Sequence, residues 1–197
     1  MKQLLIVLVT VFIVTLVACN ANSDAAAAAK PAEKTPATKE DLVKRGSYLV
    51  QISGCNDCHS PKKMGPQGPE LVPELILSGY AAGTPVPKPD KATLSSGFGT
   101  FAPDLTAAAG PWGTSYAANL TPDSSSGIGS WTEQQFKTAL TKGKSKGQEG
   151  GRMLLPPMPW VNYAKMNDED IQAIFAYLQS IKSVKNNVPL PVPPGNM

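Results

Sequence analysis

The pentapeptide Cys55-Asn56-Asp57-Cys58-His59 constrains this chain more than any other feature of its sequence. It contains the single histidine and two of the three cysteines. Two thiols at this spacing on a turn of helix match the two vinyl groups along one edge of a haem, and a histidine in the next position can ligate the iron. The motif therefore predicts one covalently bound haem c, attached at Cys55 and Cys58, with His59 as the proximal ligand.

Other uses of a Cys-x-x-Cys pair fit this chain less well. A structural zinc site needs four ligands, and the chain has no second cysteine pair and no further histidine. A thioredoxin-like redox pair follows a strand, whereas the residues before Cys55 have the pattern of a helix. A disulfide at this spacing would be strained and would leave His59 without a role.

The opposite face of the iron is predicted to bind a methionine, because no second histidine is available. Met64 follows His59 too closely along the chain, and Met166 precedes a helix cap and is typical of a packing residue. Met158 lies among three prolines that restrict the backbone around its sulfur. We therefore expect Met158 as the sixth ligand, with Met153 as the alternative.

The N-terminus has the layout of a lipoprotein signal. Residues 4–17 are apolar apart from two threonines, but this stretch is shorter than the roughly 20 residues needed to span a bilayer. It ends in Leu16-Val17-Ala18-Cys19, which matches a bacterial lipobox. We predict a signal peptide over 1–18, lipidation of Cys19 and a flexible linker over 19–38. The mature protein is then expected on the periplasmic side of a bacterial membrane, inner or outer.

Helix caps and apolar spacing predict three main helices and an all-α fold. The first starts at Thr38 and stops at Ser53-Gly54, the second runs from Trp131-Thr132 to Gly143, and the third starts at Asn167. The inward face of the first helix is predicted to carry Leu42, Tyr48, Leu49 and Ile52. The long segment between His59 and Met158 is expected to consist of loops that wrap the haem, with a short helix near residues 73–78.

Several segments of the chain resemble class I c-type cytochromes. The resemblance is closest to the single-haem lipoprotein branch that includes cytochrome subunits of bacterial membrane-bound alcohol and aldehyde dehydrogenases. The matching segments are RGSYL at 45–49, GCNDCH at 54–59, ANLTPD at 118–123, GIGSWT at 127–132, PPMPW at 156–160, DEDI at 168–171 and AYL at 176–178.

This resemblance implies a cytochrome c domain over residues 39–197, with three main helices and an extended C-terminal tail from about residue 183. It also implies Met158 as the sixth ligand and a contact between Gly46 on the first helix and Tyr177 on the last.

The expected function is electron transfer by a membrane-tethered respiratory carrier, not catalysis. The formal net charge of +3 suggests no nucleic-acid partner, and the single histidine is already assigned to the iron, which excludes a Ser/His/Asp site. The expected partners are donor and acceptor proteins, with no small-molecule substrate. Two alternatives stay open: a fixed haem subunit of a dehydrogenase complex, and a haem-based gas sensor.

Overall fold

The computed structural model describes residues 36–85 and 90–196, and the chain from Ala37 onward forms one compact unit. The predicted signal peptide 1–18, the lipidation site Cys19 and nearly all of the linker 19–38 lie outside the described residues. Within the described ranges, no helix combines the length and the apolar character needed to cross a bilayer.

Helix α2 (Lys39–Ile52) leads directly into the cysteine motif. Thr38 caps its N-terminus: the Thr38 side chain accepts a hydrogen bond from the backbone N–H of Asp41, and the Asp41 carboxylate accepts one from the backbone N–H of Thr38. Gly54 follows in the left-handed conformation, with φ of 69°, which glycine adopts without strain. This turn starts the short helix α3 (Cys55–His59). The predicted start and end of the first helix are both confirmed.

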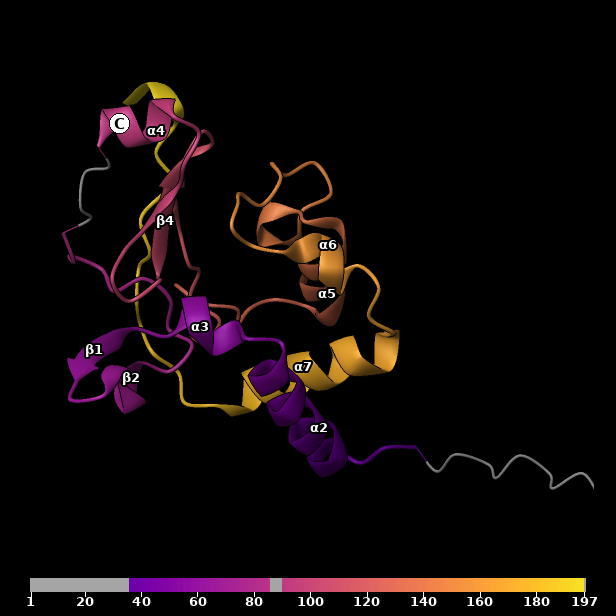
Figure 1. Ribbon diagram of the computed structural model, residues 1–197. Helices are drawn as coiled ribbons and strands as arrows, with labels where there is room; N and C mark the ends of the chain where they lie inside the picture. Colours follow the sequence, from indigo (N-terminus) through magenta and orange to yellow (C-terminus); the bar gives the residue numbers. More distant parts are fainter. Residues whose placement is uncertain (1–35, 86–89, 197) are drawn as a thin grey trace, which may run out of the picture. The chain divides into compact units, whose positions relative to one another are not determined.

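Helix α7 (Asp168–Ser180) packs across α2, as Figure 1 shows. Gly46 lies at the crossing. A Cβ atom at this position would overlap the carbonyl oxygen of Ala173 and would lie 2.7 Å from the Cβ of Tyr177. The missing side chain therefore lets the two helix backbones approach closely, and the contact between Gly46 and Tyr177 implied by the resemblance is present.

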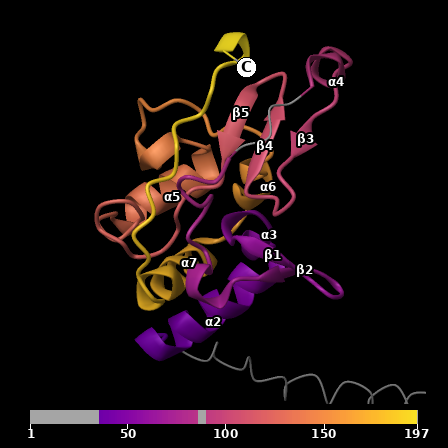
Figure 2. The ribbon, with the colours of Figure 1, turned by 90° about the vertical axis from the view of Figure 1, so that its left-hand side faces the viewer.

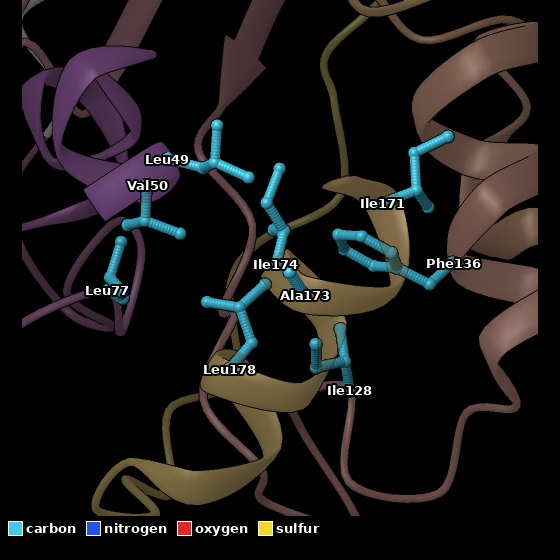
Figure 3. Close-up of a cluster of buried hydrophobic side chains, with 9 residues drawn as sticks. All are labelled: Leu49, Val50, Leu77, Ile128, Phe136, Ile171, Ala173, Ile174 and Leu178. Carbon is cyan, nitrogen blue, oxygen red and sulfur yellow. The ribbon is translucent and has the colours of Figure 1, made fainter. Parts of the chain in front are cut away.

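The hydrophobic core lies around α7, with α2 on one side and α5 (Glu133–Lys142) on the other (Figure 3). Its buried residues are Leu49, Val50, Leu77, Ile128, Phe136, Ile171, Ala173, Ile174 and Leu178.

Two residues expected on the inward face of α2 are in fact exposed. Tyr48 is 55% exposed and Ile52 is 60% exposed. The reason is that α7 covers the face of α2 that carries Gly46, Leu49 and Val50. Tyr48 and Ile52 are one turn apart on another side of the helix.

Helix α5 begins and ends where the sequence predicts. Thr132 and Gln135 form a reciprocal capping box, and Gly143 ends the helix with φ of 64°. A Cβ at Gly143 would meet the indole ring of Trp160, the first residue of α6 (Trp160–Tyr163). Because Gly143 has no side chain, the Trp160 ring can pack closely against the end of α5.

The expectation of an all-α fold is wrong, because two antiparallel sheets lie between the cysteine motif and α5. Strands β1 (Lys62–Gly65) and β2 (Gly68–Leu71) form a hairpin. The second sheet has the order β3 (Thr100–Phe101), β4 (Ala107–Gly110) and β5 (Gly113–Tyr116). Figure 1 shows this second sheet and the α5–α6 pair on opposite sides of α3, and Figure 2 shows the three strands side by side.

Both hairpins have two-residue turns flanked by glycines, at 65–68 and 110–113. Such turns are typical of β-hairpins, and they are the feature of the sequence from which these strands could have been predicted in place of loops. The short helix expected near residues 73–78 is a single turn of 3-10 helix, η1 (Pro73–Leu75). A further short helix, α4 (Lys91–Ser95), and a 3-10 turn after α5, η2 (Ser145–Gly147), were not expected.

The C-terminal tail runs back along the sheet side of the domain to η3 (Pro194–Asn196). The backbone of Val192 exchanges two hydrogen bonds with Thr114 on β5, at 2.8 and 2.9 Å. The tail therefore pairs locally with the second sheet and covers its edge.

Candidate functional site

The two thiols of the cysteine motif lie on α3 and are partly buried. Cys55 and Cys58 are not joined by a disulfide. Burial raises the pKa of Cys55 to about 11 and also raises the pKa of Cys58. Redox-active Cys-x-x-Cys pairs show the opposite shift, because their nucleophilic thiol is stabilised as a thiolate. The pair therefore lacks the activated thiolate of a thioredoxin-like site.

The ring of His59 is fixed by one hydrogen bond. Its Nδ1 atom lies 2.8 Å from the backbone carbonyl oxygen of Ala118. A carbonyl oxygen can only accept, so Nδ1 carries the hydrogen and Nε2 keeps its lone pair. Burial lowers the pKa of His59, and the bond to Ala118 opposes that shift. A neutral imidazole with an oriented, free Nε2 is the form that ligates a metal.

This donor set fits haem c better than a bare metal ion. Within residues 36–85 and 90–196, no three His, Cys, Asp or Glu side chains come together as a metal site. A structural zinc ion would need four such ligands. Two neutral thiols and one free imidazole nitrogen on a single short helix are what covalent haem attachment requires.

The backbone around the motif is held by buried contacts from the segment that follows. The buried hydroxyl of Ser60 donates to the Asn56 side chain and accepts from the backbone N–H of Leu77, both at 2.8 Å. The backbone N–H of Gly79 donates to the carbonyl oxygen of His59 at 2.7 Å. These bonds fix α3 relative to residues 77–79.

The four candidate methionines lie in different environments. Met64 is 73% exposed on β1, and Met153 is 41% exposed and pairs with Lys144 in an isolated antiparallel bridge. Met166 packs against the hydrophobic core, as expected. Met158 is partly buried. Of the two methionines that the sequence leaves open, Met158 is thus the more enclosed.

The loop that carries Met158 is anchored at two points that precede the methionine in the chain. The hydroxyl of Ser115 on β5 donates to the carbonyl oxygen of Pro156 at 2.6 Å. The backbone N–H of Leu154 donates to the carbonyl oxygen of Gly143 at 2.7 Å. Both anchors restrict where the Met158 sulfur can move.

A third anchor links the end of this loop to the cysteine motif. The hydroxyl of Tyr163 on α6 donates to the carbonyl oxygen of Ser53 at 2.9 Å. Burial raises the pKa of Tyr163, and interaction with Cys55 and Cys58 raises it further. The segment after Met158 therefore reaches the immediate surroundings of both thiols.

The partners of the site that were not predicted from the sequence include the Ala118 carbonyl and the hydroxyls of Ser115 and Tyr163. Every residue has a backbone carbonyl, so the sequence does not indicate that Ala118 binds His59. Ser115 lies in a strand that was not predicted. Tyr163 follows the proline-rich loop closely, and this proximity is the one weak signal that could have suggested it.

Comparison with known proteins gives a family match over most of the chain. Residues 43–182 match the family described as Cytochrome c. The gluconate 2-dehydrogenase cytochrome c subunit of Pantoea cypripedii is 33% identical over 136 residues, which is 69% of this chain and 22% of that protein. The alcohol dehydrogenase (quinone), cytochrome c subunit, of Gluconobacter oxydans is 30% identical over 146 residues, covering 74% of this chain and 23% of that protein.

A third relative, the fructose dehydrogenase cytochrome subunit of Gluconobacter japonicus, is 28% identical over 170 residues, or 83% of this chain and 27% of that protein. The chain thus spans about a quarter of the length of these relatives. The similarity concerns one portion of each larger protein.

Proposed function

This chain belongs to the cytochrome c family, and we propose that it transfers single electrons through one covalently bound haem c with His/Met axial ligation. In this proposal Cys55 and Cys58 form the thioether links, and His59 and Met158 bind the iron. The observation that carries it is the 2.8 Å hydrogen bond between His59 Nδ1 and the Ala118 carbonyl oxygen, which leaves Nε2 free on the same short helix as both thiols.

Haem c supplies an iron centre that gains and loses one electron, and the residues of the chain set the ease of that change. A neutral imidazole and a neutral thioether add no negative charge, which favours the reduced state. The bonds at Ser60 and Gly79 hold the cysteine motif, and those at Ser115 and Tyr163 hold the methionine loop. A site fixed on both sides needs little rearrangement when its charge changes.

We propose that the chain is an electron carrier with no catalytic activity of its own. The similar proteins in the comparisons are named as cytochrome subunits of dehydrogenases. A carrier needs only brief contacts with a donor protein and an acceptor protein.

We further propose export and anchoring through a lipid on Cys19. The support is the N-terminal sequence, in which a short apolar stretch ends in Leu-Val-Ala-Cys. A lipid at this position would keep the domain at the periplasmic side of a bacterial membrane, and the linker over 19–38 would let it reach different partners.

A second candidate function is a fixed haem subunit of a dehydrogenase complex. The names of the relatives favour it. Stable co-purification with a catalytic dehydrogenase subunit would support this candidate, whereas purification of the chain alone would support the mobile carrier. Tight carbon monoxide binding by the reduced protein would count against both and would favour a gas sensor.

The experiment that tests the main proposal is the optical spectrum of the purified, exported full chain in both oxidation states, together with its intact mass. The expected result is a c-type haemochrome, the mass of one haem added to the polypeptide, and the weak red band of methionine-ligated ferric haem. A mature polypeptide with two unmodified thiols and no added haem mass would overturn the proposal.

A further inference from the structure

Lys62, the first residue of β1, turns its side chain back onto the cysteine motif. Its ammonium group shares its three hydrogens among the backbone carbonyl oxygens of Asp57 at 2.6 Å, Asp104 at 2.9 Å, Ser60 at 3.0 Å and Asn56 at 3.4 Å. Three of these acceptors belong to α3 or to the residue that ends it. The ammonium is therefore held against the C-terminal end of the attachment helix.

In the described ranges, the Lys62 ammonium forms no ion pair with a carboxylate. All four acceptors are neutral carbonyl groups. Its side chain is partly buried, whereas that of the next residue, Lys63, is exposed. Water and salt therefore screen Lys62 less than they screen Lys63.

The charge of Lys62 lies beside the cysteine motif. Its acceptors Asn56 and Asp57 stand between the two cysteines, and Ser60 directly follows His59. A fixed cation at this distance disfavours the addition of positive charge at the site.

We propose that the positive charge of Lys62 raises the reduction potential of the haem c bound at this motif. This inference rests on the proposed function. Loss of an electron from the iron adds one positive charge to the site, and a fixed ammonium beside the attachment helix makes the more positive, oxidised form less favourable.

Lys62 also connects the motif to the second sheet region. Its bond to the Asp104 carbonyl crosses from α3 to the loop before β4. The carboxylate of Asp104 accepts hydrogen bonds from the side chain and backbone of Thr106, which fixes the position of that loop. The ammonium is thus held from two separate segments, which fixes its position relative to α3.

The test compares Lys62→Gln, Lys62→Met and Lys62→Arg with a matched control, Lys63→Gln, in the full haem-loaded protein. A redox titration measures the ratio of reduced to oxidised protein at fixed ambient potential. The two neutral variants are expected to lower that ratio by about threefold to tenfold, where tenfold corresponds to about 59 mV for a one-electron couple. Lys62→Arg is expected to keep the wild-type ratio.

Lys63→Gln is expected to change the ratio by less than about twofold, and raised salt should remove that change while leaving most of the effect of Lys62→Gln. Wild-type ratios in both neutral variants would overturn the role of Lys62, although the wild-type spectrum would still support the proposed function. Failure of both neutral variants to attach haem would also overturn it, in favour of a purely structural role. A wild-type protein without haem would instead overturn the proposed function itself.

Discussion

The hydroxyl of Tyr163 donates a 2.9 Å hydrogen bond to the carbonyl oxygen of Ser53, which joins α6 to the turn before the cysteine motif. Tyr163→Phe removes this donor and leaves a carbonyl oxygen at the end of α2 without its partner. We expect the free energy of unfolding to fall by about 1 kcal/mol, measured by urea titration of the haem-loaded protein. The matched control is Tyr48→Phe on exposed surface, and an equal loss in both variants would contradict this role.

Met158 and Met153 give a paired test of the sixth ligand. Met158→Ala removes the more enclosed thioether, and we expect the weak red band of the oxidised protein to disappear. Met153→Ala removes a side chain that is 41% exposed and should keep the band. The optical spectrum of each oxidised variant measures this. Survival of the band in Met158→Ala would reject our assignment, and its loss in Met153→Ala alone would transfer the role to Met153.

The crossing of α2 and α7 depends on the missing side chain at Gly46. A Cβ there would overlap the Ala173 carbonyl oxygen, so Gly46→Ala must push the two helices apart. We expect the variant to lose about 1–3 kcal/mol in the free energy of unfolding, as is usual for overpacked interiors. Ser47→Ala, at the exposed next position, should change it by less than about 0.5 kcal/mol. Equal stabilities would show that the helices do not pack closely here.

The helices could be predicted from the sequence because their ends are set by local contacts. Thr38, Thr132 and Asn167 each accept a hydrogen bond from a backbone N–H three residues further along the chain, and this arrangement is visible as a short motif. Gly143 ends its helix in a conformation that glycine favours. The cysteine motif likewise predicts haem chemistry by its residue types and spacing alone, because both thiols and the imidazole are adjacent in the chain.

The sheets and much of the site could not be predicted, because they depend on contacts between distant segments. The buried residues Ala107, Ala108 and Ala109 of β4 are small and show no alternation of polar and apolar side chains. The partner of His59 is a backbone atom of Ala118, which any residue could provide. The role of Lys62 appears only when the loop at Asp104 is folded against α3.

Asp123 gives a prediction for the pH dependence of stability. Hydrogen bonds from the hydroxyls of Ser125 and Ser126, and from their backbone N–H groups, lower its pKa from 3.8 to about 2. The folded state therefore favours the ionised form, so this contribution is present above about pH 4 and is lost as pH falls towards 2.

Urea titrations of the wild type and of Asp123→Asn at a series of pH values test this directly. The stability difference between them is expected to be largest near neutral pH and to shrink between pH 4 and pH 2. Ser124→Ala, an exposed change in the same loop, should give a difference that does not vary with pH in this way. A constant difference for Asp123→Asn would contradict the assigned hydrogen bonds.

Asn186 fastens the C-terminal tail to the segment that follows η1. Its Nδ2 atom donates to the carbonyl oxygens of Ser78 and Tyr80 at 2.7 and 2.8 Å, and its Oδ1 accepts from the backbone N–H of Ala82 at 2.9 Å. Ser78 and Tyr80 are buried, so Asn186→Ala leaves backbone groups there without partners.

We expect Asn186→Ala to lower the free energy of unfolding by about 1–3 kcal/mol, and the exposed neighbour Asn187→Ala to change it by less than about 0.5 kcal/mol. Because Gly79 in the same segment donates to the carbonyl oxygen of His59, release of the tail should also increase amide hydrogen exchange at residues 77–82. Unchanged amide hydrogen exchange at residues 77–82 would mean that the cysteine motif alone is enough to hold these residues in place. In that case the tail would stabilise other parts of the domain, through the pairing of Val192 with Thr114 and the hydrogen bonds of Val184 to Asn119 and Thr121.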